Sequence, residues 1–206
     1  MKKTFSALLI AAMFSLFQFS QLPAYSSENT LASQTYSSRI VSLPSGIRSF
    51  EHILNLPGLD NVGRISPSVY RGNQPKKEGY KTLREIGIRT VINLRSHHRE
   101  KNMVESIGMR YLAFPIGMLE RVKKDEIKRI VQAIANPANQ PVYVHCALGQ
   151  DRTGIVVAAY RMDIDGWSLD EAEKEMQAFG FNDTWVHLKK FIRKYSEHSI
   201  GKKKPE

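Results

Sequence analysis

The sequence predicts an α/β fold in which a mainly parallel central sheet is flanked by helices. First, short runs of β-branched and aromatic residues alternate with segments whose apolar residues recur at helical spacing, which favours parallel strands joined by helices. Second, 206 residues, 42% of them hydrophobic, suffice for one domain with a sizeable core but not for two of ordinary size. Third, the single cysteine excludes a scaffold of internal disulfides.

Four segments are predicted as strands because they are short and rich in β-branched or aromatic residues. The first is expected at an edge of the sheet, and the second and fourth have the composition of buried strands. In chain order they span residues 68–71, 89–94, 110–114 and 142–146.

The predicted helices are recognised mainly by their ends. Gly87 and Gly108 each stand where a glycine terminates a helix, and Ser168 and Glu171 have the spacing of a capping box. Asp183 is the expected N-cap of the last helix. The predicted helices span residues 76–86, 99–107, 125–135, 155–162, 168–179 and the segment that follows Asp183.

The chain is expected to divide into four parts. Lys2 and Lys3 followed by an apolar stretch and a small residue at Ala24 predict a signal peptide at residues 1–24, and therefore an exported protein. A retained membrane anchor is the alternative, but the apolar stretch is shorter than the roughly 20 residues of a spanning helix. Residues 25–46 are predicted as a flexible N-terminal segment, 47–199 as the folded domain and 200–206 as a charged tail.

The charge balance favours anionic partners. Thirty Lys and Arg against twenty Asp and Glu give a net charge of +10, which suits phosphates, nucleic acid or lipid head groups without choosing among them. The charged tail is interpreted as a solvated terminus, so no specific nucleic-acid partner is expected, and no stable membrane anchor after signal cleavage. Six histidines without ligand spacing and a lone cysteine predict neither a metal site nor another cofactor.

The segment 145–154, with the sequence HCALGQDRTG, carries the chemistry. It joins a predicted strand to a predicted helix, so backbone N–H groups at the positive helix N-terminus are expected to form a phosphate cradle. Gly149 permits the left-handed backbone that a tight loop often needs, and Arg152 is positioned to hold two phosphate oxygens with its planar fork. The predicted phosphate-binding loop is Ala147, Leu148, Gly149 and Gln150.

Cys146 is the predicted nucleophile. The helix N-terminus and Arg152 stabilise its thiolate, which lies in position for in-line attack on a bound phosphoryl group. The product is a cysteinyl-phosphate that water hydrolyses in a second step, and Thr153 is a candidate to assist the sulfur as leaving group there. His145 is expected behind the nucleophile, outside direct contact with substrate. No metal is required.

The pattern His-Cys-x-x-Gly-x-x-Arg-Thr-Gly resembles the signature loop of the cysteine-based tyrosine and dual-specificity phosphatase superfamily. Upstream, residues 69–95 are similar to the opening of small bacterial dual-specificity-like phosphatases, and the resemblance covers about residues 60–165. It implies a dual-specificity-phosphatase-like fold and a phosphomonoester hydrolase.

The general acid is the point where the sequence departs from that resemblance. The family usually supplies an aspartate from a loop before the cysteine, but residues 116–118, after Pro115, are Ile-Gly-Met. Asp151 is the first candidate, since myotubularin-like lipid phosphatases are similar in having Cys-x-x-Gly-x-Asp-Arg. Bracing of the loop is an equal alternative role for Asp151, and Glu120 is a weaker candidate for the acid.

The expected substrate is an anionic phosphorylated small molecule. Arg71, Lys76 and Arg95 are predicted to contribute to a basic mouth. An exported enzyme rarely meets cytoplasmic phosphoproteins, and the chain resembles exported, phytase-like enzymes, so inositol polyphosphates come first. A phosphotyrosine or dual-specificity protein phosphatase and a phospholipid phosphatase are alternatives. So are an arsenate reductase, a sulfurtransferase and a catalytically silent phosphate-binding module. The oligomeric state is left open.

Overall fold

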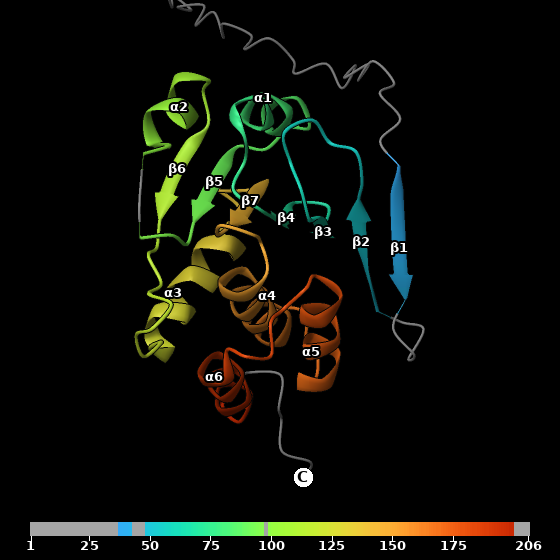
Figure 1. The fold of residues 1–206 in the computed structure, drawn as a ribbon, viewed down its shortest axis with the longest axis vertical. Coiled ribbons are helices and arrows are strands. Elements are labelled where there is room, and N and C mark those ends of the chain that lie inside the picture. Colours follow the sequence, from blue (N-terminus) through green and yellow to red (C-terminus); the bar gives the residue numbers. More distant parts are fainter. Residues whose placement is uncertain (1–36, 43–47, 97–98, 200–206) are drawn as a thin grey trace, which may run out of the picture. The chain divides into compact units, whose positions relative to one another are not determined.

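The computed structural model describes residues 37–42, 48–96 and 99–199. The predicted signal peptide and charged tail lie outside these residues. Within them, seven strands form one sheet in the order β1-β2-β3-β4-β7-β5-β6 (Figure 1). The strands are β1 (Ser38–Ser42), β2 (Ser49–Ile53), β3 (Val62–Ser66), β4 (Val69–Gly72), β5 (Thr90–Asn93), β6 (Arg110–Ala113) and β7 (Val142–His145). The helices are α1 (Lys77–Glu85), α2 (Lys101–Ser106), α3 (Lys124–Ala135), α4 (Asp151–Asp163), α5 (Leu169–Ala178) and α6 (Val186–Ser196).

The α/β class is confirmed, and the sheet is mixed. Strands β4, β7, β5 and β6 pair in parallel, whereas β1, β2, β3 and β4 pair antiparallel. The prediction that β4 is an edge strand is wrong, because β3 covers its outer side. Residues 38–42 were expected to be flexible, yet they pair with β2 as a strand, so the ordered part begins before residue 47. The short, polar β1–β3 segments lack the apolar runs that identified the other strands.

Helices cover both faces of the sheet (Figure 1). On β7, Tyr143 belongs to a core with α1 and α2, while Val142 and Val144 belong to a core with α3 to α6. Successive residues of a strand point to opposite faces, so a strand buried on both sides has no polar face. Helix α4 is buried along almost its whole length, as expected of a helix that is apolar on all sides. Strand β7 and helix α4 thus fix both ends of the segment that joins them.

Most helix boundaries agree with the sequence predictions. The capping box of Ser168 and Glu171 is present at the start of α5. The prediction of Asp183 as N-cap is wrong: α6 begins at Val186, and the Asp183 carboxylate instead accepts hydrogen bonds from Lys189 and Gln177. Helix α4 begins at residue 151, earlier than predicted.

None of the helices in the described part of the chain is long and apolar enough to cross a bilayer.

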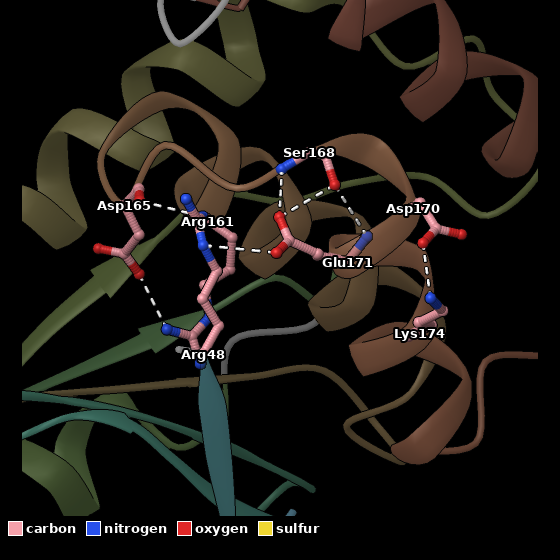
Figure 2. Close-up of polar contacts among 7 residues, drawn as sticks. All are labelled: Arg48, Arg161, Asp165, Ser168, Asp170, Glu171 and Lys174. Carbon is pink, nitrogen blue, oxygen red and sulfur yellow. Dashed lines mark hydrogen bonds and ion pairs between the residues drawn. The ribbon is translucent and has the colours of Figure 1, made fainter. Parts of the chain in front are cut away.

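A buried ion pair joins α4 to α5. The guanidinium of Arg161 donates two hydrogen bonds to the carboxylate of Glu175, at 3.1 and 2.8 Å, and the two side chains are 4% and 1% exposed. Arg161 also pairs with Asp165 at 2.9 Å, and Arg48 donates to the Asp165 carbonyl (Figure 2). Because both buried charges are compensated, the pair ties α5 to α4 without leaving an unpaired ion in the core.

The substitution Arg161→Met should lower the free energy of unfolding by about 3–5 kcal/mol, because Glu175 would remain buried without a partner. Urea unfolding followed by circular dichroism measures the loss. Adding Glu175→Leu should recover most of it, because both charges are then removed together. Lys174→Met is the control: Lys174 forms a surface ion pair with the exposed Asp170 on α5, so stability should change little. A loss for Arg161→Met no larger than that of the control would contradict this account.

Candidate active site

The segment 145–154 forms a turn from the end of β7 into the start of α4, as the sequence predicted. Cys146 is the first residue after β7, and Asp151 is the first residue of α4. Gly149 has a φ of 72°, and a Cβ there would lie 2.3 Å from the carbonyl carbon of Gly72. Both the left-handed conformation and this close backbone approach require glycine at position 149.

Three successive carbonyl groups of the loop are held by groups outside it. The bonds run from Gln74 N to Ala147 O (3.1 Å), from Asn61 Nδ2 to Leu148 O (3.2 Å) and from Arg71 Nη2 to Gly149 O (2.9 Å). In a trans peptide the N–H of the next residue points away from the carbonyl. The N–H groups of residues 148–150 are therefore turned away from these anchoring groups. The N–H of Gly149 contributes a hydrogen bond to the sulfur of Cys146. This is the backbone arrangement that the motif predicted, and its binding of phosphate stays a prediction.

Cys146 lies at the floor of this loop, 4% exposed. Burial raises the pKa of its thiol. Hydrogen bonds from the hydroxyl and backbone N–H of Thr153, the charge of Arg152 and the N–H of Gly149 together outweigh burial, so the pKa lies below its ordinary value. The predicted stabilisation of the thiolate by the helix start and by Arg152 is therefore present, with Thr153 as an additional contributor.

Arg152 and Thr153 follow on the first turn of α4. Arg152 is half-buried, and its Nη1 lies 3.5 Å from the carbonyl oxygen of Ile116, on the segment between β6 and α3. Thr153 is fully buried, its hydroxyl has no other hydrogen-bond partner among the described residues, and its side chain lowers the pKa of Cys146. The structure thus brings both predicted residues to the nucleophile: Arg152 with its guanidinium group and Thr153 with its hydroxyl.

A buried carboxylate behind the nucleophile was missed by the sequence analysis. Glu100 Oε1 lies 3.3 Å from Nε2 of His145, whose Nδ1 lies 3.0 Å from the Cys146 carbonyl oxygen. Tyr80 donates its hydroxyl to Glu100. Burial raises the pKa of Glu100, but His145, Tyr80 and the charge of Arg95 outweigh it and lower the pKa. Glu100 is therefore ionised at neutral pH and holds the His145 ring in place. Glu100 lies at the start of the helix predicted over residues 99–107, where an acidic residue is ordinary, so its residue type gave no signal for this role.

The predicted basic mouth is only partly correct. Arg71 is fully buried and donates to the loop carbonyl of Gly149, with its guanidinium 4.1 Å from the ring centre of Phe179. Burial lowers the pKa of Arg71 to about 10, with Glu175 and Cys146 acting against it, so it stays charged at neutral pH. Arg71 therefore supports the loop from behind instead of meeting substrate.

The other two predicted basic residues lie on the surface. Arg95 is half-buried and donates to the side chain of Gln74, whose backbone N–H holds the loop at Ala147, so Arg95 lies beside the cradle. Lys76 is exposed at the start of α1, and its Nζ lies 3.3 Å from Asp60. The structure therefore links Arg95 to the loop, whereas Lys76 forms a solvent-exposed ion pair.

The two candidates for the general acid differ in position. Asp151 is half-buried at the start of α4, and its Oδ1 accepts a hydrogen bond from the backbone N–H of Asn182 at 2.9 Å. It thus braces the segment before α6, where the sequence analysis expected bracing of the loop itself. Glu120 is exposed on the segment between β6 and α3. Of these two carboxylates, Asp151 is the one next to Arg152.

The substitution Thr153→Val should raise the pKa of Cys146, because the thiolate loses the hydroxyl that donates to it. Alkylation by iodoacetamide, measured against pH, should show its inflection below about 8.5 in the wild type and at higher pH in Thr153→Val. At pH 6.5 alkylation should be several-fold slower in the variant, since less thiolate is present. Thr153→Ser keeps the hydroxyl and serves as the control. The same inflection in Thr153→Val and the wild type would contradict the assigned donor.

Comparison with known proteins agrees with this geometry. The dual specificity protein phosphatase TpbA of Pseudomonas aeruginosa is 30% identical over 124 residues, which are 60% of this chain and 56% of TpbA. The inositol diphosphatase SIW14 of Saccharomyces cerevisiae is 23% identical over 166 residues, 75% of this chain and 58% of SIW14. The chain thus spans little more than half the length of these two relatives.

Solved structures show the same fold. The crystal structure of TpbA superposes with a TM-score of 0.59 at 28% identity, covering 65% of this chain and 84% of the other. The core catalytic domain of SIW14 superposes with a TM-score of 0.63 at 21% identity, covering 70% of this chain and 90% of the other. The tyrosine phosphatase family matches residues 58–206, which include the whole cradle. The chain therefore belongs to the tyrosine phosphatase family, within the superfamily of cysteine-based phosphatases.

Proposed function

We propose that the protein is a phosphomonoester hydrolase that works through a cysteinyl-phosphate intermediate on Cys146. The observation that carries the proposal is the single thiol, whose pKa is lowered and which lies at the floor of the loop. The loop carbonyls bond to groups outside the loop, so the N–H groups of residues 148–150 are turned away from those groups. A phosphoryl group in the cradle accepts hydrogen bonds from the loop N–H groups and from Arg152. These donors stabilise the charge that develops on the equatorial oxygens during transfer.

The reaction proceeds in two displacements. The Cys146 thiolate attacks phosphorus and forms an S–P bond while the bond from phosphorus to the leaving oxygen breaks, and the leaving oxygen takes up a proton. Water then attacks phosphorus, the S–P bond breaks, inorganic phosphate leaves and the thiolate is restored. The hydroxyl of Thr153 donates to the sulfur again as it leaves, so the same contact serves both steps.

Asp151 is the proposed donor of the proton to the leaving oxygen. It lies beside Arg152 at the start of α4, and its Oδ1 is bonded to the Asn182 N–H. This bond holds Oδ1 at the segment before α6, and Oδ2 is the oxygen that we propose carries the proton. In the second step the same group accepts a proton from the attacking water.

Asp151→Asn should lower kcat for an alkyl phosphate by about 100-fold or more, because an alkoxide leaves poorly without a proton. For nitrophenyl phosphate, whose leaving group is stable as an anion, the loss should be much smaller. Asparagine keeps an Oδ1 that accepts from Asn182, so the brace survives the substitution. Glu120→Gln is the control and should change neither rate. Equal losses on both substrates would show that Asp151 only braces the structure.

Inositol polyphosphates are the proposed substrates. The relative SIW14 is an inositol diphosphatase, and the net charge of +10 favours a polyanion over a singly phosphorylated side chain. Arg95, held beside the loop through Gln74, is in position to meet a second phosphate of such a ligand. The competing substrate class is phosphotyrosine, since TpbA is a dual specificity protein phosphatase.

The ratio of kcat/KM for inositol hexakisphosphate to that for a phosphotyrosyl peptide should exceed ten in the wild-type protein. Arg95→Gln should lower kcat/KM for the inositol substrate several-fold and change that for nitrophenyl phosphate little. Arg84→Gln, on the exposed side of α1, is the matched control. Cys146→Ser should abolish turnover of every substrate, including nitrophenyl phosphate. A preference for the peptide would overturn the substrate class but not the mechanism.

A further inference from the structure

A basic groove lies between the segment that precedes α3 and one side of α6. It has a volume of about 710 Å³. Its walls carry five cationic side chains, three from the segment and the start of α3 and two from α6. They are Arg121, Lys123, Lys124, Lys190 and Lys194. None of the residues that form the loop at 146–150 lines this groove.

The charge of the groove is not neutralised by the acidic residues in the part of the chain that the structure describes. None of its five cations has an ion pair with a described acidic residue, and Glu120 is the only acid in its lining. Their neighbours on α6 differ: Lys189 pairs with Asp183 at 2.5 Å, and Arg193 pairs with Glu173 at 2.8 Å. Among the described residues, the cations on the groove side of α6 are thus the ones without an ion-pair partner.

The groove also has apolar walls. Leu119 is 89% exposed at its edge, and Val122, Phe191 and Tyr195 lie in its lining. The rim is held in place by a contact from Nε2 of His187 to the carbonyl oxygen of Met118, at 2.8 Å. Cations placed around an apolar surface suit a ligand that combines negative charge with an apolar portion. The volume falls within the usual range for small-molecule sites, about 300–1,000 Å³.

We propose that this groove, which we call the α3–α6 groove, is a second binding site for a small organic anion that carries an aryl or short alkyl group. The anionic group contacts lysines from both walls, and the apolar portion lies against Leu119, Val122 and Phe191. The site is separate from the phosphate cradle and does not require turnover. Its existence therefore does not depend on the proposed reaction.

The fluorescent anion 8-anilino-1-naphthalenesulfonate tests the proposal. It should bind the folded protein, and Lys190→Glu with Lys194→Glu should weaken the binding at least tenfold. Arg121→Glu with Lys123→Glu, on the opposite wall, should do the same. Arg84→Glu with Arg129→Glu is the matched control: it makes the same change in net charge at exposed positions outside the groove, and affinity should stay within twofold. The uncharged analogue N-phenyl-1-naphthylamine should bind weakly and equally to all variants.

Saturating vanadate, which occupies the cradle, should leave the probe bound. Displacement of the probe by vanadate, or equal affinity in the groove variants and the control variant, would overturn the proposal. All the substituted side chains are exposed, and circular dichroism with thermal unfolding checks that each variant is folded. A protein that binds the probe as expected but lacks phosphatase activity would refute the proposed function alone.

Discussion

The outward anchoring of the loop carbonyls is the constraint on which the rest of the site depends. Carrying a negative charge on a sulfur that is 4% exposed is unfavourable, because burial removes its water. Hydrogen bonds to a charged group each contribute about 1.5–3 kcal/mol, so several donors are needed to reverse that penalty. One of them, the N–H of Gly149, is turned toward Cys146 because Asn61 holds the carbonyl at the other end of its peptide, whereas Thr153 contributes from the first turn of α4. The chemistry of the sulfur thus depends both on bonds made on the far side of the loop and on the first turn of α4.

The sequence was sufficient for the features that are local. Strand β7, the loop and α4 are contiguous, so their residue types and spacing predicted the nucleophile, Arg152, Thr153 and the glycine at position 149. The capping box of α5 and the glycines after α1 and α2 were likewise predictable from neighbouring residues. Strands β1 to β3 could not be predicted, because they are short and only partly buried. Hydrogen bonding to neighbouring strands, and not a characteristic composition, makes these segments strands.

The supports of the site could not be predicted because they come from distant parts of the chain. Arginine is usually exposed, so Arg71 was expected at the surface. Its place beneath the loop depends on the carbonyl of Gly149 and the ring of Phe179, which lie 78 and 108 positions along the chain. Glu100 reaches His145 in the same way, from the turn that precedes α2. Such roles depend on tertiary packing, for which a single sequence has no periodic signal.

The chain contains one cysteine, and its lowered pKa makes it thiolate to a greater extent than a free thiol. Peroxide converts a thiolate to a sulfenic acid, which a neighbouring thiol normally captures as a disulfide. Within this chain no second thiol exists, so the first oxidised form is left open to the irreversible sulfinic and sulfonic stages. Recovery of the reduced enzyme after oxidative stress therefore depends on reductants in its surroundings.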